Sequence, residues 1–510
     1  MSSSKAGYSR VAKVGVLWCY GSLLNELVNI PTTVITARLL SPYEFGVVAA
    51  AAFFTRLAAR LMNFGFNQAL VRLKEIRPEH YASLFVVNLV LGTLLWGVLI
   101  LLAPWIGASL KLPETSKVIP FAALGFVIDA VGSVPAAMMQ RQMQFWQKAV
   151  SGWISALTIS CTAITLAWSG FGYWSLVYAS LAGTTAQALT LTVLTGWRPR
   201  LVFSRQAMRD LLSFGMGVHS KRMLDFAALN LDNLVVGRVL GGAALGLYDK
   251  AFMIMNKVVN QLNVGGADVS FRIFALIHEE PARFRAAYCK VVMTAALISF
   301  PPLTMCIVVA PELFVTLFGE RWLAAVVPFQ VLCAAGMLRL LNQYVSAATQ
   351  AIGWVWAEVW RQVIHTALIV GGIALLSRSW GLNGAAAGLL MATAVMTVLM
   401  HAMLIRATGL SWGRLSRAVL AASVCSVGLA GTLIFARMLV RAYVIEPTSW
   451  LLLLCESGAG FAFYAAFVLF APFAEVRRLV DETITDFLPG WAAAFLRPGS
   501  QAQTPQVRNL

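Results

Sequence analysis

The chain alternates between long apolar runs and short polar connections. A helix that crosses a membrane needs about 20 mostly apolar residues, and runs of that length recur along nearly the whole sequence. Proline-containing pairs such as Ser41-Pro42 and Ala310-Pro311 mark several of their ends. The pattern predicts an all-α chain with about fourteen spanning helices, at roughly 14–37, 45–69, 82–103, 118–139, 149–168, 173–195, 211–237, 245–270, 288–310, 325–349, 357–376, 383–405, 416–437 and 449–471.

The composition points to the same class of protein. Of 510 residues, 59% are hydrophobic and 12% are charged, and the mean hydropathy is +0.75, whereas a soluble chain carries about 25% charged residues. This excludes a soluble enzyme, a nucleic-acid-binding module and a secreted disulfide scaffold. The seven cysteines lie in or beside apolar runs without CxxC spacing, so we expect no disulfide framework and no metal site. We predict a polytopic membrane protein.

The basic residues predict the orientation of the chain. The net charge is +17, and with the N-terminus inside, roughly three-quarters of the Lys and Arg residues in the connections lie on the inner side. We therefore predict that both termini are cytoplasmic, and that the charge sets the topology without binding nucleic acid. Residues 473–510 begin with amphipathic spacing and become polar, which predicts a cytoplasmic tail that is first amphipathic and then disordered.

An internal repeat relates the first six predicted helices to the next six. With an offset of 200, Arg38 aligns with Arg238 and Gly46 with Gly246; with an offset of 208, residues 118–121 align with 326–329. The consistent order and the slowly growing offset predict two pseudo-symmetric six-helix bundles, a plan in which transporters bind substrate at the repeat interface. The predicted parts are an N-terminal lobe at 1–200, a C-terminal lobe at 201–410, two additional transmembrane helices at 411–472 and the tail at 473–510.

The stretches ARLLSPYEFGVVAAAAFF, GFNQALVR and GFGYWSLV, together with the arrangement of six, six and two helices, resemble a known family. This is the polysaccharide transporter (Wzx-type flippase) family of the MATE-like multidrug/oligosaccharidyl-lipid/polysaccharide exporter superfamily. The resemblance covers roughly residues 10–410. It implies that the protein moves undecaprenyl-diphosphate-linked oligosaccharides across the bacterial inner membrane for exopolysaccharide, O-antigen or capsule synthesis. The implied partners are this lipid-linked anionic oligosaccharide, membrane lipids, and polysaccharide polymerase and chain-length proteins.

Several basic residues lie inside apolar spans, where each costs about 2.5–3.5 kcal/mol at a helix centre. On the second span, Arg56 and Arg60 share one face with Asn63. The repeat places Asn256 and Asn260 at the positions of the two arginines. Matching polar faces on repeat-related helices predict a central cavity between the lobes. The alternative is a buried polar seam that joins helices.

Other polar positions in the spans extend the candidate site. Five more residues are predicted to contact substrate: Asn25, Asn29, Arg222, Lys257 and Arg339. Three acidic residues are candidates for ion coupling: Glu26, Asp225 and Asp232. Asp225 has an alternative role, because it can neutralise Lys221 at i,i+4. Lys250 and Lys290 lie near helix ends, and we expect their ammonium groups to reach the membrane surface.

The excess of positive charge inside the spans favours an anionic substrate. Guanidinium groups bind diphosphate oxygens bidentately, and amide side chains suit sugar hydroxyls. We therefore predict a flippase that works by alternating access. The alternatives are a lipid II flippase and a cation-coupled multidrug or metabolite antiporter of the same superfamily. The short connections hold no nucleotide-binding motif, so we expect neither an enzyme nor a cofactor.

Overall fold

The computed structural model describes residues 25–62, 70, 76–209, 230–263, 265–443 and 448–470. Within these ranges the chain forms helices and no strands. Three helical stretches lie at 25–39, 205–209 and 230–240. The other helices are α2 (Pro42–Met62), α4 (Pro78–Leu110), α5 (Pro113–Arg141), α6 (Phe145–Trp168), α7 (Trp174–Thr195), α9 (Gly242–Leu262), α10 (Gly266–Leu276), α11 (Pro281–Phe318), the 3₁₀ turn η1 (Glu320–Ala325), α12 (Val326–Ala351), α13 (Val355–Thr408), α14 (Trp412–Tyr443) and α15 (Ser449–Leu469).

The predicted fold class is confirmed, and every predicted span has a helix in its described part. Ten helices of the described part are long and apolar enough to cross a membrane. Helix α13 contains two of the predicted spans, which meet at a non-helical Gly381 with φ +55° and ψ −133°. Helix α9 is not among the ten, because Asp249, Lys250 and Lys257 make it less apolar. The predicted number of fourteen is approximate.

One predicted span differs from the structure. Residues 245–270 were expected to form a single helix, but α9 ends at Leu262 and the separate helix α10 begins at Gly266. Gly265 has a φ of +72°, a left-handed conformation that ends a helix and that glycine adopts without steric cost. The pair Gly265-Gly266 is a local turn signal in the sequence, which a search for apolar runs does not use.

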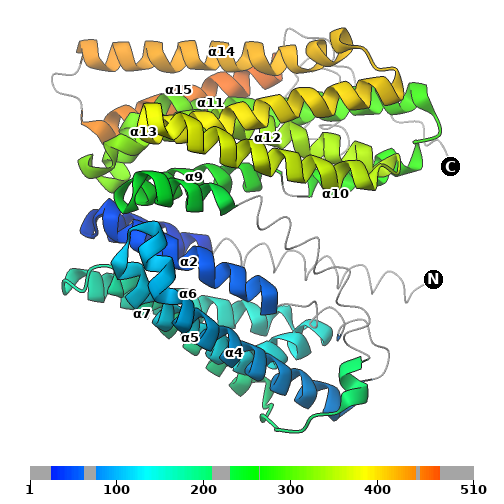
Figure 1. Cartoon of the computed structure of the whole chain (residues 1–510). Helices are drawn as coiled ribbons and strands as arrows, with labels where there is room; N and C mark the ends of the chain where they lie inside the picture. Colours follow the sequence, from blue (N-terminus) through cyan, green and yellow to red (C-terminus); the bar gives the residue numbers. More distant parts are fainter. Residues whose placement is uncertain are drawn as a thin grey trace, which may run out of the picture. The chain divides into compact units, whose positions relative to one another are not determined.

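The first compact unit contains residues 1–254, 317–332 and 359–393. Helix α5 lies at its centre and contacts α2, α4, α6 and α7 (Figure 1). Small residues allow these helices to approach closely, as at Gly132, where an added Cβ would lie 3.1 Å from the Cα of Ala188. Such small-residue contacts are typical of helices packed in a membrane, where lipid gives no hydrophobic drive for association.

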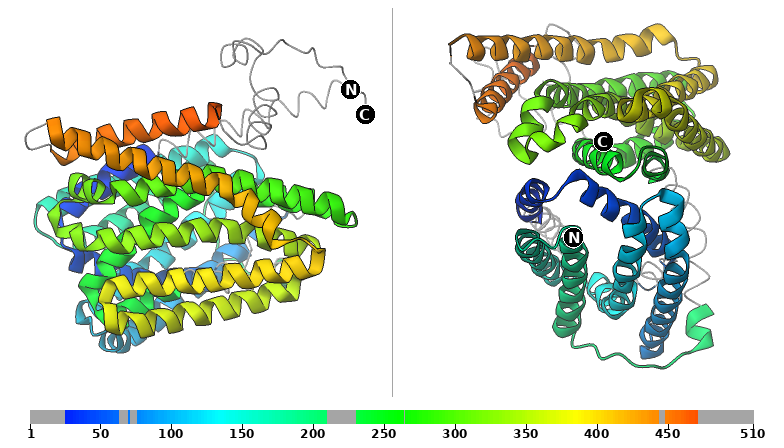
Figure 2. Two further views of the ribbon diagram at one scale, coloured as in Figure 1. Left: turned by 90° about the horizontal axis from the view of Figure 1, so that it is seen from above. Right: turned by 60° about the vertical axis from the view of Figure 1, so that its left-hand side comes forward.

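The second compact unit contains residues 255–316, 333–358 and 394–510. Its core joins α10, α11, α12, α13 and α14 through buried side chains such as Phe274, Tyr288 and Met400. Helices α14 and α15, orange and red-orange, pack side by side (Figure 2). The division of the repeat into lobes at residues 200 and 410 stays a prediction.

A tyrosine of α15 compensates for a proline inside α11. Pro301 has no N–H to donate to the carbonyl of Leu297, four residues earlier in the helix. The hydroxyl of Tyr464 donates a hydrogen bond to that carbonyl at 3.1 Å. A backbone carbonyl without a hydrogen-bond donor is costly in a membrane. The bond from Tyr464 removes this cost, so α11 can contain the proline, and it also holds α15 against α11.

Candidate functional site in the membrane spans

In the first unit, the two arginines of α2 project away from the helix packing. The buried face of α2 includes Ala51, Ala58 and Met62, whereas Arg56 and Arg60 are both exposed. The Nε of Arg56 donates to the carbonyl of Ala52 at 3.1 Å. This bond holds the stem of the side chain along the helix, while the residue stays exposed. The predicted companion on this face, residue 63, lies outside the described residues.

The helix at 25–39 presents a second polar surface of the first unit. Asn25 and Glu26 are half-buried and Asn29 is exposed. The helix is fixed to α6 by the hydroxyl of Thr32, which donates to the hydroxyl of Ser160 at 2.6 Å. The structure therefore places these polar residues on a helix with a defined partner.

Asp232 lies in a hydrogen-bonded cluster near the start of α9. It is 2% exposed and accepts bonds from the hydroxyl of Tyr248, at 3.3 Å, and from the backbone N–H of Asn233, at 2.9 Å. The amide of Asn233 donates to a carboxylate oxygen of Asp249 at 2.8 Å. Ion coupling through Asp232 stays a prediction. The other candidates of this region, Arg222 and Asp225, lie outside the described residues.

In the second unit, the end of α9 packs against α12. Gly336 allows the close approach, since an added Cβ would lie 3.0 Å from Val259 and 3.1 Å from Met255. Further along the same seam, the amide of Asn263 donates to the side-chain oxygen of Gln343. The structure thus brings together, in one unit, polar residues that are 80 positions apart in the sequence.

The predicted substrate contacts of the second unit border this seam. On α9, Asn256 and Lys257 are half-buried and Asn260 is exposed; on α12, Arg339 is half-buried. Among the described residues, the side-chain oxygens of Asn256 and Asn342 are buried and accept no hydrogen bond. An unsatisfied buried acceptor costs about 1–3 kcal/mol. These oxygens can therefore accept a bond from a hydroxyl or a water.

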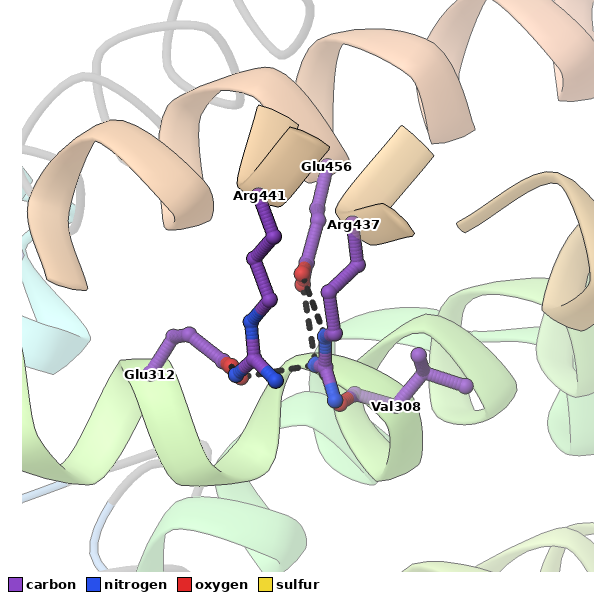
Figure 3. Close-up of polar contacts among 5 residues, drawn as sticks. All are labelled: Val308, Glu312, Arg437, Arg441 and Glu456. Atoms are coloured by element: carbon purple, nitrogen blue, oxygen red, sulfur yellow. Dashed lines mark hydrogen bonds and ion pairs between the residues drawn. The ribbon is translucent and has the colours of Figure 1, made fainter. Parts of the chain in front are cut away.

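A cluster of four charged residues in the described part of the second unit was not predicted from the sequence. The guanidinium of Arg437 on α14 donates to Glu456 on α15 at 2.7 Å, to Glu312 on α11 at 2.7 Å and to the carbonyl of Val308 at 2.8 Å (Figure 3). Arg441 lies 3.9 Å from Glu312. The side chains of Glu456 and Glu312 are 0% and 6% exposed. This cluster attaches the two additional helices to α11.

The cluster was not predicted because Arg437 is the last residue of the predicted span 416–437 and Arg441 lies beyond it, where an outer connection is expected. In the structure both lie within α14, which runs to Tyr443. A signal was available in Glu456, which lies inside the predicted span 449–471, and in Glu312, which follows the span 288–310 directly. An isolated carboxylate in a span needs a cation, and Arg437 is the cation that the structure provides.

The prediction for Lys250 is wrong. Its side chain does not reach a surface, because the residue is 4% exposed. Its ammonium lies 4.0 Å from the ring centre of Phe45, 5.6 Å from that of Trp322 and 5.9 Å from that of Phe318. Aromatic faces attract a desolvated cation by about 2 kcal/mol or more, which favours this position for the lysine.

Known proteins similar to this chain confirm the predicted resemblance. The chain is 25% identical over 379 residues to the lipopolysaccharide biosynthesis protein WzxC of Escherichia coli (strain K12), covering 73% of this chain and 76% of WzxC. It is 28% identical over 320 residues to the succinoglycan biosynthesis transport protein ExoT of Rhizobium meliloti (strain 1021), covering 62% of each. It is 27% identical over 300 residues to the teichuronic acid biosynthesis protein TuaB of Bacillus subtilis (strain 168), covering 56% of this chain and 60% of TuaB.

Two solved structures share the fold. The lipid II flippase MurJ in an inward closed conformation matches with a TM-score of 0.67 and 13% identity, covering 89% of this chain and 98% of MurJ. An inward-facing multidrug resistance MATE family transporter of the MOP superfamily matches with a TM-score of 0.59 and 18% identity, covering 76% of this chain and 95% of the transporter. The predicted MATE-like architecture is confirmed.

The family is shown by the sequence itself. Residues 35–327 match the family described as polysaccharide biosynthesis protein. The matched segment includes α2, α9 and α11, and so contains most of the candidate site residues. Because the match spans more than half of the chain, the protein belongs to the polysaccharide biosynthesis protein family.

Proposed function

We propose that the protein is a flippase of the bacterial inner membrane, with both termini in the cytoplasm. Its substrate is an oligosaccharide linked to undecaprenyl diphosphate, which it moves from the inner to the outer leaflet for surface polysaccharide synthesis. Membership of the polysaccharide biosynthesis protein family carries this proposal. The transport protein ExoT, to which the chain is similar, supports transport as the activity.

The position of the arginines on α2 supports an anionic substrate. Arg56 and Arg60 are exposed on a helix that is apolar enough to span the membrane. Against lipid tails, each guanidinium would cost about 2.5–3.5 kcal/mol near the helix centre. A water-filled cavity that admits a diphosphate removes this cost, because the phosphate oxygens bind guanidinium groups with charge-assisted hydrogen bonds.

The amides of the second unit suit the sugar part of the substrate. Asn256, Asn260 and Asn342 lie on α9 and α12 beside the closely packed seam at Gly336. An amide both donates and accepts hydrogen bonds, as a sugar hydroxyl does. In this proposal the arginines hold the diphosphate, the amides hold the sugars, and the polyprenyl chain stays in the lipid.

The membrane potential favours the proposed direction of transport. A negative interior drives an anion outward with about 2.3 kcal/mol per charge per 100 mV. Two phosphate charges would therefore gain roughly 4.6 kcal/mol if the cationic side chains do not move with them. Ion coupling through Glu26, Asp225 or Asp232 is an additional driving force in the same scheme.

Charge reversal tests the anion site. Arg56→Glu and Arg60→Glu should each abolish surface polysaccharide export while the protein still inserts into the membrane, because a carboxylate repels the diphosphate. Arg417→Glu is the matched control: Arg417 is also exposed, and its Nε donates to the carbonyl four residues earlier at 3.1 Å, as that of Arg56 does. Normal export in both α2 variants would overturn the proposal.

A lipid II flippase is the second candidate, and the likeness to the fold of MurJ is the observation that favours it. Expression of the chain in cells depleted of their own lipid II flippase separates the two. Growth of these cells would assign lipid II as the substrate. Continued lysis, with restored export in a mutant that lacks its polysaccharide flippase, would support the proposal. A cation-coupled antiporter, the third candidate, is disfavoured by the excess of basic residues in the spans.

A further inference from the structure

Helices α2 and α9 meet through a reciprocal pair of glycines in the first unit. A Cβ added to Gly46 would lie 2.7 Å from the carbonyl carbon of Gly242, and one added to Gly246 would lie 2.9 Å from that of Pro42. In the repeat, residue 42 corresponds to 242 and residue 46 to 246. The equivalent glycine of each repeat therefore contacts the equivalent backbone position of the other repeat.

Two arginines form a second reciprocal contact at the same end of the unit. The Nε of Arg38 donates to the carbonyl of Leu317 at 3.0 Å, and the guanidinium of Arg238 donates to the carbonyl of Ser109. The arginines are related by the offset of 200, and the two acceptors by the offset of 208 found for the neighbouring helices. Each arginine thus reaches from its own repeat to the equivalent carbonyl in the other repeat.

A third contact breaks this symmetry. The ammonium of Lys250 lies 4.0 Å from the ring centre of Phe45, beside Gly46. The residues related to these two by the repeat are Ala50 and Leu245, which form no such pair. The indole N–H of Trp322, which also faces Lys250, donates to the carbonyl of residue 37 at 2.9 Å. The contact between α2 and α9 is therefore asymmetric: Lys250 of α9 packs on aromatic rings, and the repeat has no equivalent pair on the α2 side.

We propose that these contacts form the outer gate of the transporter, which closes the two repeats against each other and opens to release the substrate. This inference rests on the proposed function. Apart from Lys250, which lies on α9 beyond them, the residues lie in or beside connections, at 37–46, 109–112, 238–246 and 317–322. The Lys and Arg distribution predicts the outer side for these connections. Arg38 and Arg238 are exposed, so water can replace their bonds to the carbonyls when the gate opens.

The glycines explain how the gate closes tightly. Backbone meets backbone at Gly46 and Gly246, so even a methyl group on either residue holds the helices apart. A β-branched side chain there should favour the open gate. Gly97 on α4 is the matched control, since an added Cβ would meet nothing within 4 Å.

Thiol labelling from outside tests the gate directly. Leu112 is 2% exposed and covers Gly242, so a cysteine at this position reports opening. In a variant without the seven native cysteines, Leu112→Cys should react slowly with a membrane-impermeant maleimide. Adding Arg38→Glu or Arg238→Glu should raise the rate severalfold and to a similar extent, because the two arginines are equivalent.

Control variants make the result specific. Gly46→Val should also raise the labelling rate, whereas Gly97→Val and Arg378→Glu, an exposed arginine of another predicted outer connection, should not. An unchanged rate in both arginine variants, with normal amounts of protein in the membrane, would overturn the gate. A rise in the labelling rate for only one of the two variants would contradict the equivalence of Arg38 and Arg238 in the gate. The arginine variants keep the test valid if Gly46→Val does not fold.

Labelling also separates the gate from the proposed function. The rate reports the opening of the outer side whatever substrate is carried. If labelling behaves as expected but Arg56→Glu exports normally, the gate stands and the substrate proposal fails. If labelling is unchanged and Arg56→Glu loses export, the substrate proposal stands and the gate fails.

Discussion

Replacing Arg437 with alanine would leave Glu456 without its cation, and Glu312 with only the exposed Arg441, inside the packing of α11, α14 and α15. Glu456 is fully buried, and Glu312 is 6% exposed. Breaking a buried ion pair from one side costs about 3–5 kcal/mol, because the remaining charge stays desolvated. We therefore expect Arg437→Ala to lower the ratio of folded to unfolded protein by roughly two to three and a half orders of magnitude, at about 1.4 kcal/mol per tenfold.

Heating in detergent, followed by size-exclusion chromatography, measures this effect as the midpoint for loss of the monodisperse peak. Arg441→Ala is the control. Its side chain is 60% exposed and its guanidinium lies 3.9 Å from Glu312, and such exposed pairs contribute about 0–1 kcal/mol. Arg437→Ala should lower the midpoint by several degrees and Arg441→Ala by little. Equal midpoints for the two variants would refute the assignment of the buried cluster.

A neutral replacement of the whole cluster tests the cause. In the triple variant Arg437→Met, Glu312→Met and Glu456→Met, no unpaired charge remains buried. Replacing a buried ionic group by hydrophobic residues of similar volume is often neutral or stabilising. The triple variant should therefore recover most of the midpoint that Arg437→Ala loses. If it is as unstable as Arg437→Ala, shape and not charge determines the stability of this site.

Two further predictions use the same heating assay, and a third uses the yield of folded protein. Tyr464→Phe should cost about 1–3 kcal/mol, because a buried α11 carbonyl loses its donor; an unchanged midpoint would contradict this. Phe45→Leu should be destabilising by about 2 kcal/mol alone but nearly neutral beside Lys250→Met; equal losses in both backgrounds would exclude the cation–π contact. Gly388→Val should strongly reduce folded protein while Gly371→Ala does not, because a Cβ at Gly388 overlaps backbone and one at Gly371 meets nothing; normal yield of Gly388→Val would contradict the packing.

Helix positions could be predicted from the sequence because membrane spans obey a strong local rule. A backbone in lipid must satisfy its own hydrogen bonds, so a long apolar run is a helix wherever it lies in the fold. The length of apolar runs did not predict the break between α9 and α10. This break depends on the left-handed backbone of Gly265, a local feature that hydropathy does not carry.

Side-chain partners were predictable only in part. The exposed face of Arg56 and Arg60 follows from helical spacing, and the structure places both there. The partners of Arg437 and Lys250 come from other helices, so their contacts depend on tertiary packing that one helix does not encode. From its position near a helix end, Lys250 was expected at the membrane surface, and Arg437, at the end of a predicted span, was not expected to form buried ion pairs.

The internal repeat predicts which residues are equivalent, but not which residues are in contact. Sequence comparison within the chain identifies Gly46 and Gly246 as equivalent residues. It does not say that they touch, since equivalent residues of two repeats can lie far apart. The structure adds that they lie at the point where the two helices cross.

The central claim is that cationic side chains of α2 receive an anionic lipid headgroup. Native mass spectrometry of the purified protein tests it with two lipids of equal chain length, undecaprenyl diphosphate and the uncharged undecaprenol. We expect the wild-type protein and Arg417→Glu to retain the diphosphate lipid preferentially, and Arg56→Glu and Arg60→Glu to lose this preference. Equal retention of the two lipids by the wild-type protein, or an undiminished preference in both α2 variants, would contradict the claim.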